Sequence, residues 1–156
     1  MADTTDTANV LVRPPIAWGL TILAGFVLDW IEPLPFMPSE ASAIWLGAIV
    51  FFSALALAFW AVATMTGAGS NVPTSRPTTV IVESGPYRFS RNPIYLGMVL
   101  ALIGMAITFD TFWLLLTLVP FALVIRYGVV AREEAYLERK FGDVYRSYCS
   151  RVRRWL

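Results

Sequence analysis

This sequence predicts an all-α integral membrane protein with about four transmembrane helices and a cytoplasmic C-terminal helical tail. The 156 residues are 57% hydrophobic and 15% charged, whereas about a quarter of the residues of a soluble domain are charged. The apolar residues gather in four runs, and the basic residues gather between alternate runs. The mean hydropathy is +0.63, and the length suits a single domain over residues 1–156.

The first two apolar runs predict an N-terminal helix pair within residues 1–66. Residues 14–31 are apolar but for one aspartate, and these 18 residues just suffice to cross a bilayer. Three prolines in residues 32–40 make a stiff connector, and residues 41–66 form a second run without a charge. Before these runs, the polar residues 1–12 predict a frayed or interfacial terminus.

The second half of the chain begins with a loop over residues 67–79 that is rich in glycine and proline. A third apolar run covers residues 93–108 and a fourth covers residues 111–125. These two runs are either short spans or a re-entrant hairpin, and in both cases their outer ends return to the same side. From Arg132 the chain becomes charged, which predicts a helix that leaves the membrane and is ended by Gly142.

The distribution of basic residues predicts the orientation. All twelve lie before the first run, in the central loop, near the end of the fourth run or in the tail. The connectors at residues 32–40 and 109–110 contain none. The positive-inside rule therefore places both termini and the central loop in the cytoplasm, and four spans require the same parity.

The residue types exclude several kinds of chemistry. The chain contains no histidine, which removes the commonest general base and metal ligand. Cys149 is the only cysteine, so neither a Cys/His metal site nor an internal disulfide can form. No histidine can activate Cys149 as a nucleophile. We expect no metal and no nucleic acid, and a membrane as the surroundings.

The stretch from Gly85 to Gly97 joins cationic and aromatic residues to the start of the third apolar run. Asn92 is a favourable helix N-cap, and Pro93 suits the first helical position. The unpaired N–H groups at such a helix start favour an anion. Arginines and tyrosines also mark membrane interfaces, so the spacing alone leaves a ligand site and an interface equally open.

Gly85 to Gly97 resembles the signature G-P-Y-R-x-x-R-H/N-P-x-Y-x-G of the isoprenylcysteine carboxyl methyltransferase and phospholipid methyltransferase superfamily. Residues 133–148 are similar to its second block, E-E-x-x-L-x-x-x-F-G-x-x-Y-x-x-Y. The resemblance implies a cofactor-binding core in residues 67–156, with S-adenosylmethionine as methyl donor and a lipophilic acceptor that enters from the bilayer. The isoprenylcysteine branch carries histidine where this chain has Asn92, which leaves the acceptor open.

The resemblance also implies roles for residues of the two blocks. Arg88, Arg91 and the helix start at Asn92 would hold the donor carboxylate, and Glu133 or Glu134 would take its ammonium or ribose hydroxyls. Tyrosines would flank the adenine or the sulfonium. Alternatively, the glutamates form a solvated helix face and the tyrosines anchor the interface. The predicted cofactor-binding residues are Tyr87, Arg88, Arg91, Asn92, Pro93, Tyr95, Gly97, Glu133, Glu134, Tyr145 and Tyr148.

Arg126 and Glu133 are the candidate catalytic residues. They are seven positions apart, so in an α-helix they would lie about 20° apart on one face. A charge within a membrane segment indicates function, and Arg126 could hold a polar acceptor head. An arginine that snorkels to the inner surface is an equally good interpretation.

These observations predict S-adenosylmethionine-dependent methyl transfer to a lipophilic acceptor at the cytoplasmic side of the membrane. The enzyme would position donor and acceptor and exclude water. Two alternatives are an NADPH-dependent membrane reductase related to the sterol reductases and a non-catalytic membrane scaffold of the same fold. Binding of S-adenosylmethionine, of NADPH or of neither distinguishes them. The residues leave open the oligomeric state and whether the acceptor is a carboxylate, an amine or a thiol.

Overall fold

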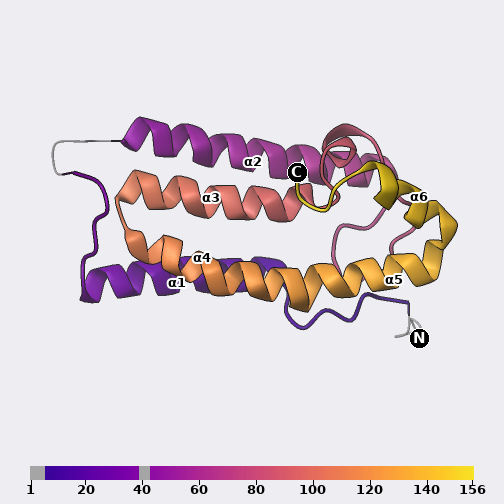
Figure 1. Cartoon of the computed structure of the whole chain (residues 1–156), viewed down its shortest axis with the longest axis horizontal. Helices are drawn as coiled ribbons and strands as arrows, with labels where there is room; N and C mark the ends of the chain where they lie inside the picture. Colours follow the sequence, from indigo (N-terminus) through magenta and orange to yellow (C-terminus); the bar gives the residue numbers. More distant parts are fainter. Residues whose placement is uncertain (1–5, 39–42) are drawn as a thin grey trace.

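The computed structural model describes residues 6–38 and 43–156, and every regular element within these ranges is helical. The elements are α1 (Pro14–Ile31), α2 (Ile44–Gly67), the 3₁₀-helix η1 (Gly85–Arg88), α3 (Pro93–Phe109), α4 (Phe112–Leu123), the π-helix η2 (Val124–Val130), α5 (Ala131–Phe141) and α6 (Asp143–Arg151). Helices α1 to α4 run alternately in opposite directions, with α2 packed along α3 and α1 along α4 (Figure 1). Helix α4 continues without a break through η2 into α5.

Within the described residues, three helices are long and apolar enough to cross a bilayer, namely α1, α2 and the continuous helix over Phe112–Phe141. The 17 residues of α3 extend about 25 Å at about 1.5 Å per residue, so three to four helices are able to span. This confirms the all-helical membrane fold. The predicted start of the second helix, at Ala41, lies outside the described residues. A short re-entrant hairpin does not form, because α4 is the first part of a 30-residue helix.

Large apolar side chains face outward from the bundle. Leu20 on α1 is 59% exposed, and Trp45 and Phe59 on α2 are 83% and 70% exposed. A soluble monomer rarely exposes apolar surface on this scale. The outer faces of α1 and α2 are therefore suited to contact with lipid chains.

Helices α2 and α3 approach each other closely because glycines lie at their interface. A Cβ atom on Gly104 would lie 2.6 Å from the backbone nitrogen of Phe51, and one on Gly97 would lie 2.9 Å from the carbonyl oxygen of Ala54. Neither position has room for a side chain. Small residues of this kind let helices pack in lipid, where burial from water does not drive association.

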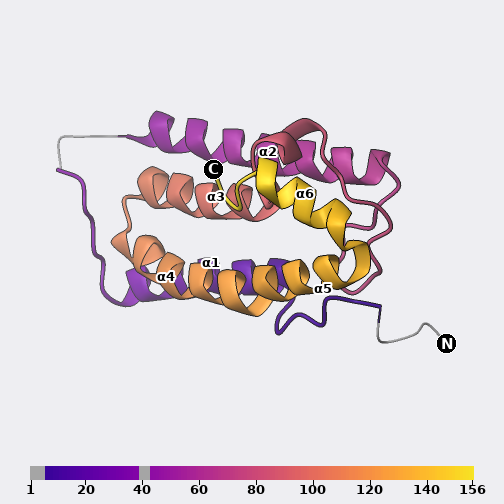
Figure 2. The same cartoon turned by 45° about the vertical axis from the view of Figure 1, so that its right-hand side comes forward.

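The two ends of the bundle differ in chemistry. At one end, Asp110 terminates α3 in the left-handed conformation, with a φ of 49°. Its carboxylate accepts hydrogen bonds from the N–H groups of Phe36 and Met37 at 3.0 and 2.9 Å, which ties the two connectors together. The N-terminal segment, the central loop, α5 and α6 gather at the opposite end (Figure 2). That end holds the polar elements that carry the sequence blocks.

Residues 6–12 of the N-terminal segment pack against the rest of the chain, so this part is not frayed. Residues 1–5 lie outside the described residues, and an interfacial position of the terminus stays a prediction. The Leu11 N–H donates to the Gly128 carbonyl at 3.0 Å. The Lys140 ammonium forms an ion pair with Asp6 at 2.8 Å. Both partners belong to the last long helix, and the local polar composition of the terminus could not reveal them.

Gly142 ends α5 as the sequence predicts. Its φ is 53°, and its N–H donates to the Glu138 carbonyl at 2.9 Å. The turn sends α6 back toward the start of α3, where the Tyr148 hydroxyl donates to the Tyr87 carbonyl at 2.8 Å. The chain reversal at Gly142 thereby brings the end of the second block onto the first block.

Candidate active site

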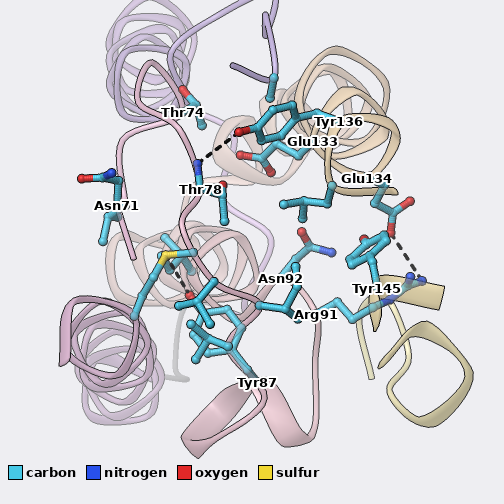
Figure 3. Close-up of a pocket in the computed structure, with 18 of the residues that line it drawn as sticks. Asn71, Thr74, Thr78, Tyr87, Arg91, Asn92, Glu133, Glu134, Tyr136 and Tyr145 are labelled. Carbon is cyan, nitrogen blue, oxygen red and sulfur yellow. Dashed lines mark hydrogen bonds and ion pairs between the residues drawn. The ribbon is translucent and has the colours of Figure 1, made fainter. Parts of the chain in front are cut away.

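A cavity of about 110 Å³ lies at the polar end of the bundle, where the central loop meets the start of α3 and helices α5 and α6 (Figure 3). Both sequence blocks contribute to its wall. The antiparallel course of α3 and α4 returns the chain to this end, which is how the two blocks meet. The predicted residues that line the cavity are Tyr87, Arg91, Asn92, Pro93, Tyr95, Glu133, Glu134, Tyr145 and Tyr148.

The hydrogen bonds at the start of α3 differ from the predicted helix cap. Asn92 occupies the N-cap position before Pro93, but its side chain makes no capping hydrogen bond. Its amide donates instead to the Arg154 carbonyl at 3.0 Å. The Asn92 N–H donates a hydrogen bond to the Ser90 hydroxyl oxygen at 3.1 Å. The C-terminal segment therefore covers this helix start, and the Asn92 N–H is not free to receive an anion.

Glu134 is an ion-paired carboxylate. Arg154 donates to it from two nitrogens, with Nε 2.9 Å from Oε1 and Nη2 2.6 Å from Oε2. Arg91 Nη2 lies 3.4 Å from Oε1, and Arg91 also contacts the Cys149 sulfur. Bidentate arginine–carboxylate pairs are strong and directional. Glu134 therefore has little capacity left for a cationic ligand.

Glu133 has a different environment although it is the adjacent residue. Its Oε1 accepts a hydrogen bond from the Tyr95 hydroxyl at 2.8 Å. No lysine or arginine among residues 6–38 and 43–156 forms an ion pair with it. Its carboxyl group lines the cavity, where its ionised form could pair with a cationic ligand.

The tyrosines of the site are neutral hydrogen-bonding groups. Burial, together with the nearby Glu133, raises the pKa of Tyr87, and burial, together with Glu134, raises the pKa of Tyr145. Burial likewise raises the pKa of Tyr148. These phenols remain protonated at neutral pH, so they can donate hydrogen bonds and provide aromatic surface but are poor proton acceptors.

Three of the predicted site residues lie outside this cavity wall. Arg88 is exposed at the end of η1. Gly97 belongs to the α2–α3 interface, where it allows the close approach described above. Arg126 is partly buried within η2, with its guanidinium carbon 5.2 Å from the centre of the Tyr127 ring. None of the three is among the cavity-lining residues.

The helix between Arg126 and Glu133 is not α-helical throughout, so the shared face expected from their spacing does not follow. Hydrogen bonds in a π-helix close from residue i to i+5, so each residue turns through a smaller angle than in an α-helix. The expected separation of about 20° assumed α-helical turns throughout, and it does not hold across η2. Pro120 lies four residues before the π-helix η2 begins at Val124. A proline lacks an N–H group and disturbs the preceding helical turn.

Sequence reasoning missed one whole wall of the cavity. Nine of the residues between Asn71 and Val82 in the central loop line it, as do Ala8 and Met65. The Tyr136 hydroxyl accepts a hydrogen bond from the Thr78 N–H at 3.2 Å and connects this loop to α5 (Figure 3). Tyr136 could have been found, since it lies three residues after Glu133 and therefore on the same helix face. The loop residues carry no periodic signal.

The amino-acid sequence of this chain is similar to those of known proteins. Residues 42–144, more than half of the chain, match the phospholipid methyltransferase family. A protein of Haemophilus influenzae described as uncharacterized is 44% identical over 63 residues, which cover 40% of this chain and 100% of that protein. The matched family region includes the first block and the adjacent glutamates Glu133 and Glu134 of α5.

Proposed function

This chain belongs to the phospholipid methyltransferase family, and from that membership we propose that it transfers a methyl group from S-adenosylmethionine to a lipophilic acceptor. The observation that carries the proposal is the Glu133 carboxylate, which lines the cavity and forms no ion pair within the described ranges. The donor has two cationic groups, an ammonium and a sulfonium. An unpaired carboxylate with limited access to water attracts such groups more strongly than an exposed one.

The cavity also offers a positive group for the donor carboxylate. Arg91 and Arg154 share one carboxylate, that of Glu134, so these three side chains carry a formal net charge of +1. The buried Nε of Arg91 has no hydrogen-bond partner in the described part of the chain. Glu133 and Arg91 lie on different sides of the cavity in Figure 3. A ligand with separate positive and negative groups suits this arrangement.

The remaining wall supplies polar and apolar surface. Asn71, Thr74 and Thr78 come from the central loop, and their side chains are suited to ribose hydroxyls. Met65 and Ile94 are apolar lining residues near the end of α2 and the start of α3. These two residues are suited to contact a lipophilic acceptor that approaches between the helices.

The reacting carbon is the methyl group that S-adenosylmethionine carries on its sulfonium. The chain positions the two reactants and excludes water. An acceptor carboxylate needs no base, whereas an amine or thiol must lose a proton. Because the site tyrosines are held protonated, Glu133 is the group in the wall best suited to receive that proton.

Arg126 is the second residue to which we assign a role in the reaction. Its planar guanidinium matches a carboxylate or phosphate of an acceptor head, and it lies in an apolar stretch near the end of the span. We propose that it holds the acceptor head rather than the donor. This assignment agrees with its place outside the cavity wall.

We propose that the polar end of the bundle faces the cytoplasm. The basic residues concentrate in the elements of that end, as the positive-inside rule requires. Ser75 is exposed in the central loop, so a Ser75→Cys probe in a Cys149→Ser background can report the side. The proposal predicts labelling only after the cells are permeabilised, and labelling of intact cells would reverse the orientation.

Ligand binding tests the proposed activity directly. Calorimetry on the purified protein in detergent should detect S-adenosylmethionine and should detect no binding of NADPH. The reverse result would favour the reductase alternative, and binding of neither ligand would favour the scaffold. Incubation of the protein with lipid extract and isotopically labelled donor, followed by mass spectrometry, should then identify the methylated acceptor.

A further inference from the structure

The C-terminal segment of residues 152–156 lies against the start of α3 and is anchored there by its backbone. The Arg153 carbonyl accepts a hydrogen bond from the Arg91 N–H at 3.0 Å. The Arg154 carbonyl accepts one from the Asn92 amide at 3.0 Å. Trp155 packs against the main apolar core. The segment therefore holds the Arg154 side chain in a defined place beside the cavity, although Arg154 itself does not line it.

Arg154 and Arg91 compete for the same carboxylate, and Arg154 has the closer contact. Its Nη2 lies 2.6 Å from Glu134 Oε2, whereas Arg91 Nη2 lies 3.4 Å from Oε1. The Glu134 side chain is only 16% exposed, so water screens these interactions incompletely. Without Arg154, Glu134 would neutralise Arg91, and the formal charge of the cluster would fall from +1 to zero.

We propose that Arg154 is a positioning residue that occupies Glu134 and so keeps the charge of Arg91 available for the carboxylate of the methyl donor. The inference rests on the proposed function, because it assumes S-adenosylmethionine as the ligand. It also explains how two adjacent glutamates have different roles. Glu134 is held by the C-terminal segment, while Glu133 remains available for the cationic groups of the donor.

A purely structural role for Arg154 makes a different prediction. If Arg154 only attaches the C-terminal segment to α5, its removal should weaken every ligand of the cavity to the same extent. If it acts through Arg91, its removal should weaken only ligands that carry a carboxylate. Removing Glu134 as well should then restore affinity, because no carboxylate would remain to neutralise Arg91.

The experiment is calorimetry on the full-length protein in detergent with S-adenosylmethionine and with decarboxylated S-adenosylmethionine. We expect Arg154→Gln to weaken binding of the first ligand about 10-fold or more, the effect of one charge-assisted hydrogen bond, and to leave the second ligand within about twofold. The double variant Arg154→Gln/Glu134→Gln should return to within about threefold of the wild type for S-adenosylmethionine. Arg153→Gln is the matched control, since its side chain is exposed and its carbonyl contact is retained.

Equal losses for both ligands, or a double variant as weak as the single one, would overturn the proposal in favour of a structural attachment. Unchanged affinity in Arg154→Gln would overturn it as well. If Arg154→Gln does not purify as a folded protein, the double variant decides alone. Near-wild-type affinity for S-adenosylmethionine supports the proposal, and a shared loss for both ligands rejects it. Absence of binding to the wild-type protein would instead reject the proposed function.

Discussion

Replacing Glu133 with glutamine tests the proposed donor site most directly. The substitution removes the negative charge and keeps the size of the side chain. It also keeps an oxygen that can accept the hydrogen bond now donated by the Tyr95 hydroxyl at 2.8 Å. The fold should therefore be retained, while the attraction for a cationic ligand is lost.

The expected size of the effect follows from the environment of Glu133. A hydrogen bond to a charged group contributes about 1.5–3 kcal/mol, and about 1.4 kcal/mol corresponds to a factor of ten in affinity. Glu133 is partly buried and has no ion-pair partner in the described ranges. No lysine or arginine there therefore competes with a cationic ligand for its carboxylate. We expect Glu133→Gln to weaken S-adenosylmethionine binding about 10- to 100-fold.

The assay is calorimetry in detergent with two ligands, and thermal unfolding confirms that the variant is folded. S-adenosylhomocysteine keeps the ammonium but lacks the sulfonium charge. A similar loss for both ligands would show that Glu133 faces the ammonium, and a loss for S-adenosylmethionine alone would show that it faces the sulfonium. Glu138→Gln is the matched control, because Glu138 lies on the same helix as Glu133, is exposed, and pairs with Arg146 of α6 at 3.5 Å. Wild-type affinity for both ligands in a folded Glu133→Gln protein would refute the reasoning.

Three further predictions concern the loop wall, the helix interface and the acceptor. Tyr136→Phe should weaken donor binding and increase hydrogen exchange in residues 71–82, because the hydroxyl that accepts the Thr78 N–H is lost; unchanged exchange would contradict a role in holding the loop. Gly104→Leu should lower the thermal midpoint, since overpacking costs about 1–3 kcal/mol, and an unchanged midpoint would contradict the close α2–α3 contact. Arg126→Lys should keep donor affinity but lower kcat/KM for the acceptor about 10-fold or more, as loss of the bidentate fork predicts; unchanged acceptor kinetics would leave Arg126 as an interface anchor.

The sequence determined the helices and much of the site membership, because both depend on signals that act over short distances. Apolar runs bounded by proline, glycine and charged residues specified α1 at residues 14–31, and they specified the end of α5 at Gly142. A run without charge has one stable conformation in lipid, since a helix satisfies its own backbone hydrogen bonds. The two blocks likewise predicted that Arg91 and Glu133 belong to one pocket, and both residues line the same cavity.

Only the tertiary structure decided which of these side chains are paired and which are available. Asn92 has the local features of a helix cap, yet its amide bonds to the Arg154 carbonyl, which comes from the far end of the chain. Glu133 and Glu134 are indistinguishable in the sequence, but Arg154 pairs with one of them and leaves the other without a cation among the described residues. Charge interactions depend on distance and burial in space, and neither quantity follows from the order of residues along a helix.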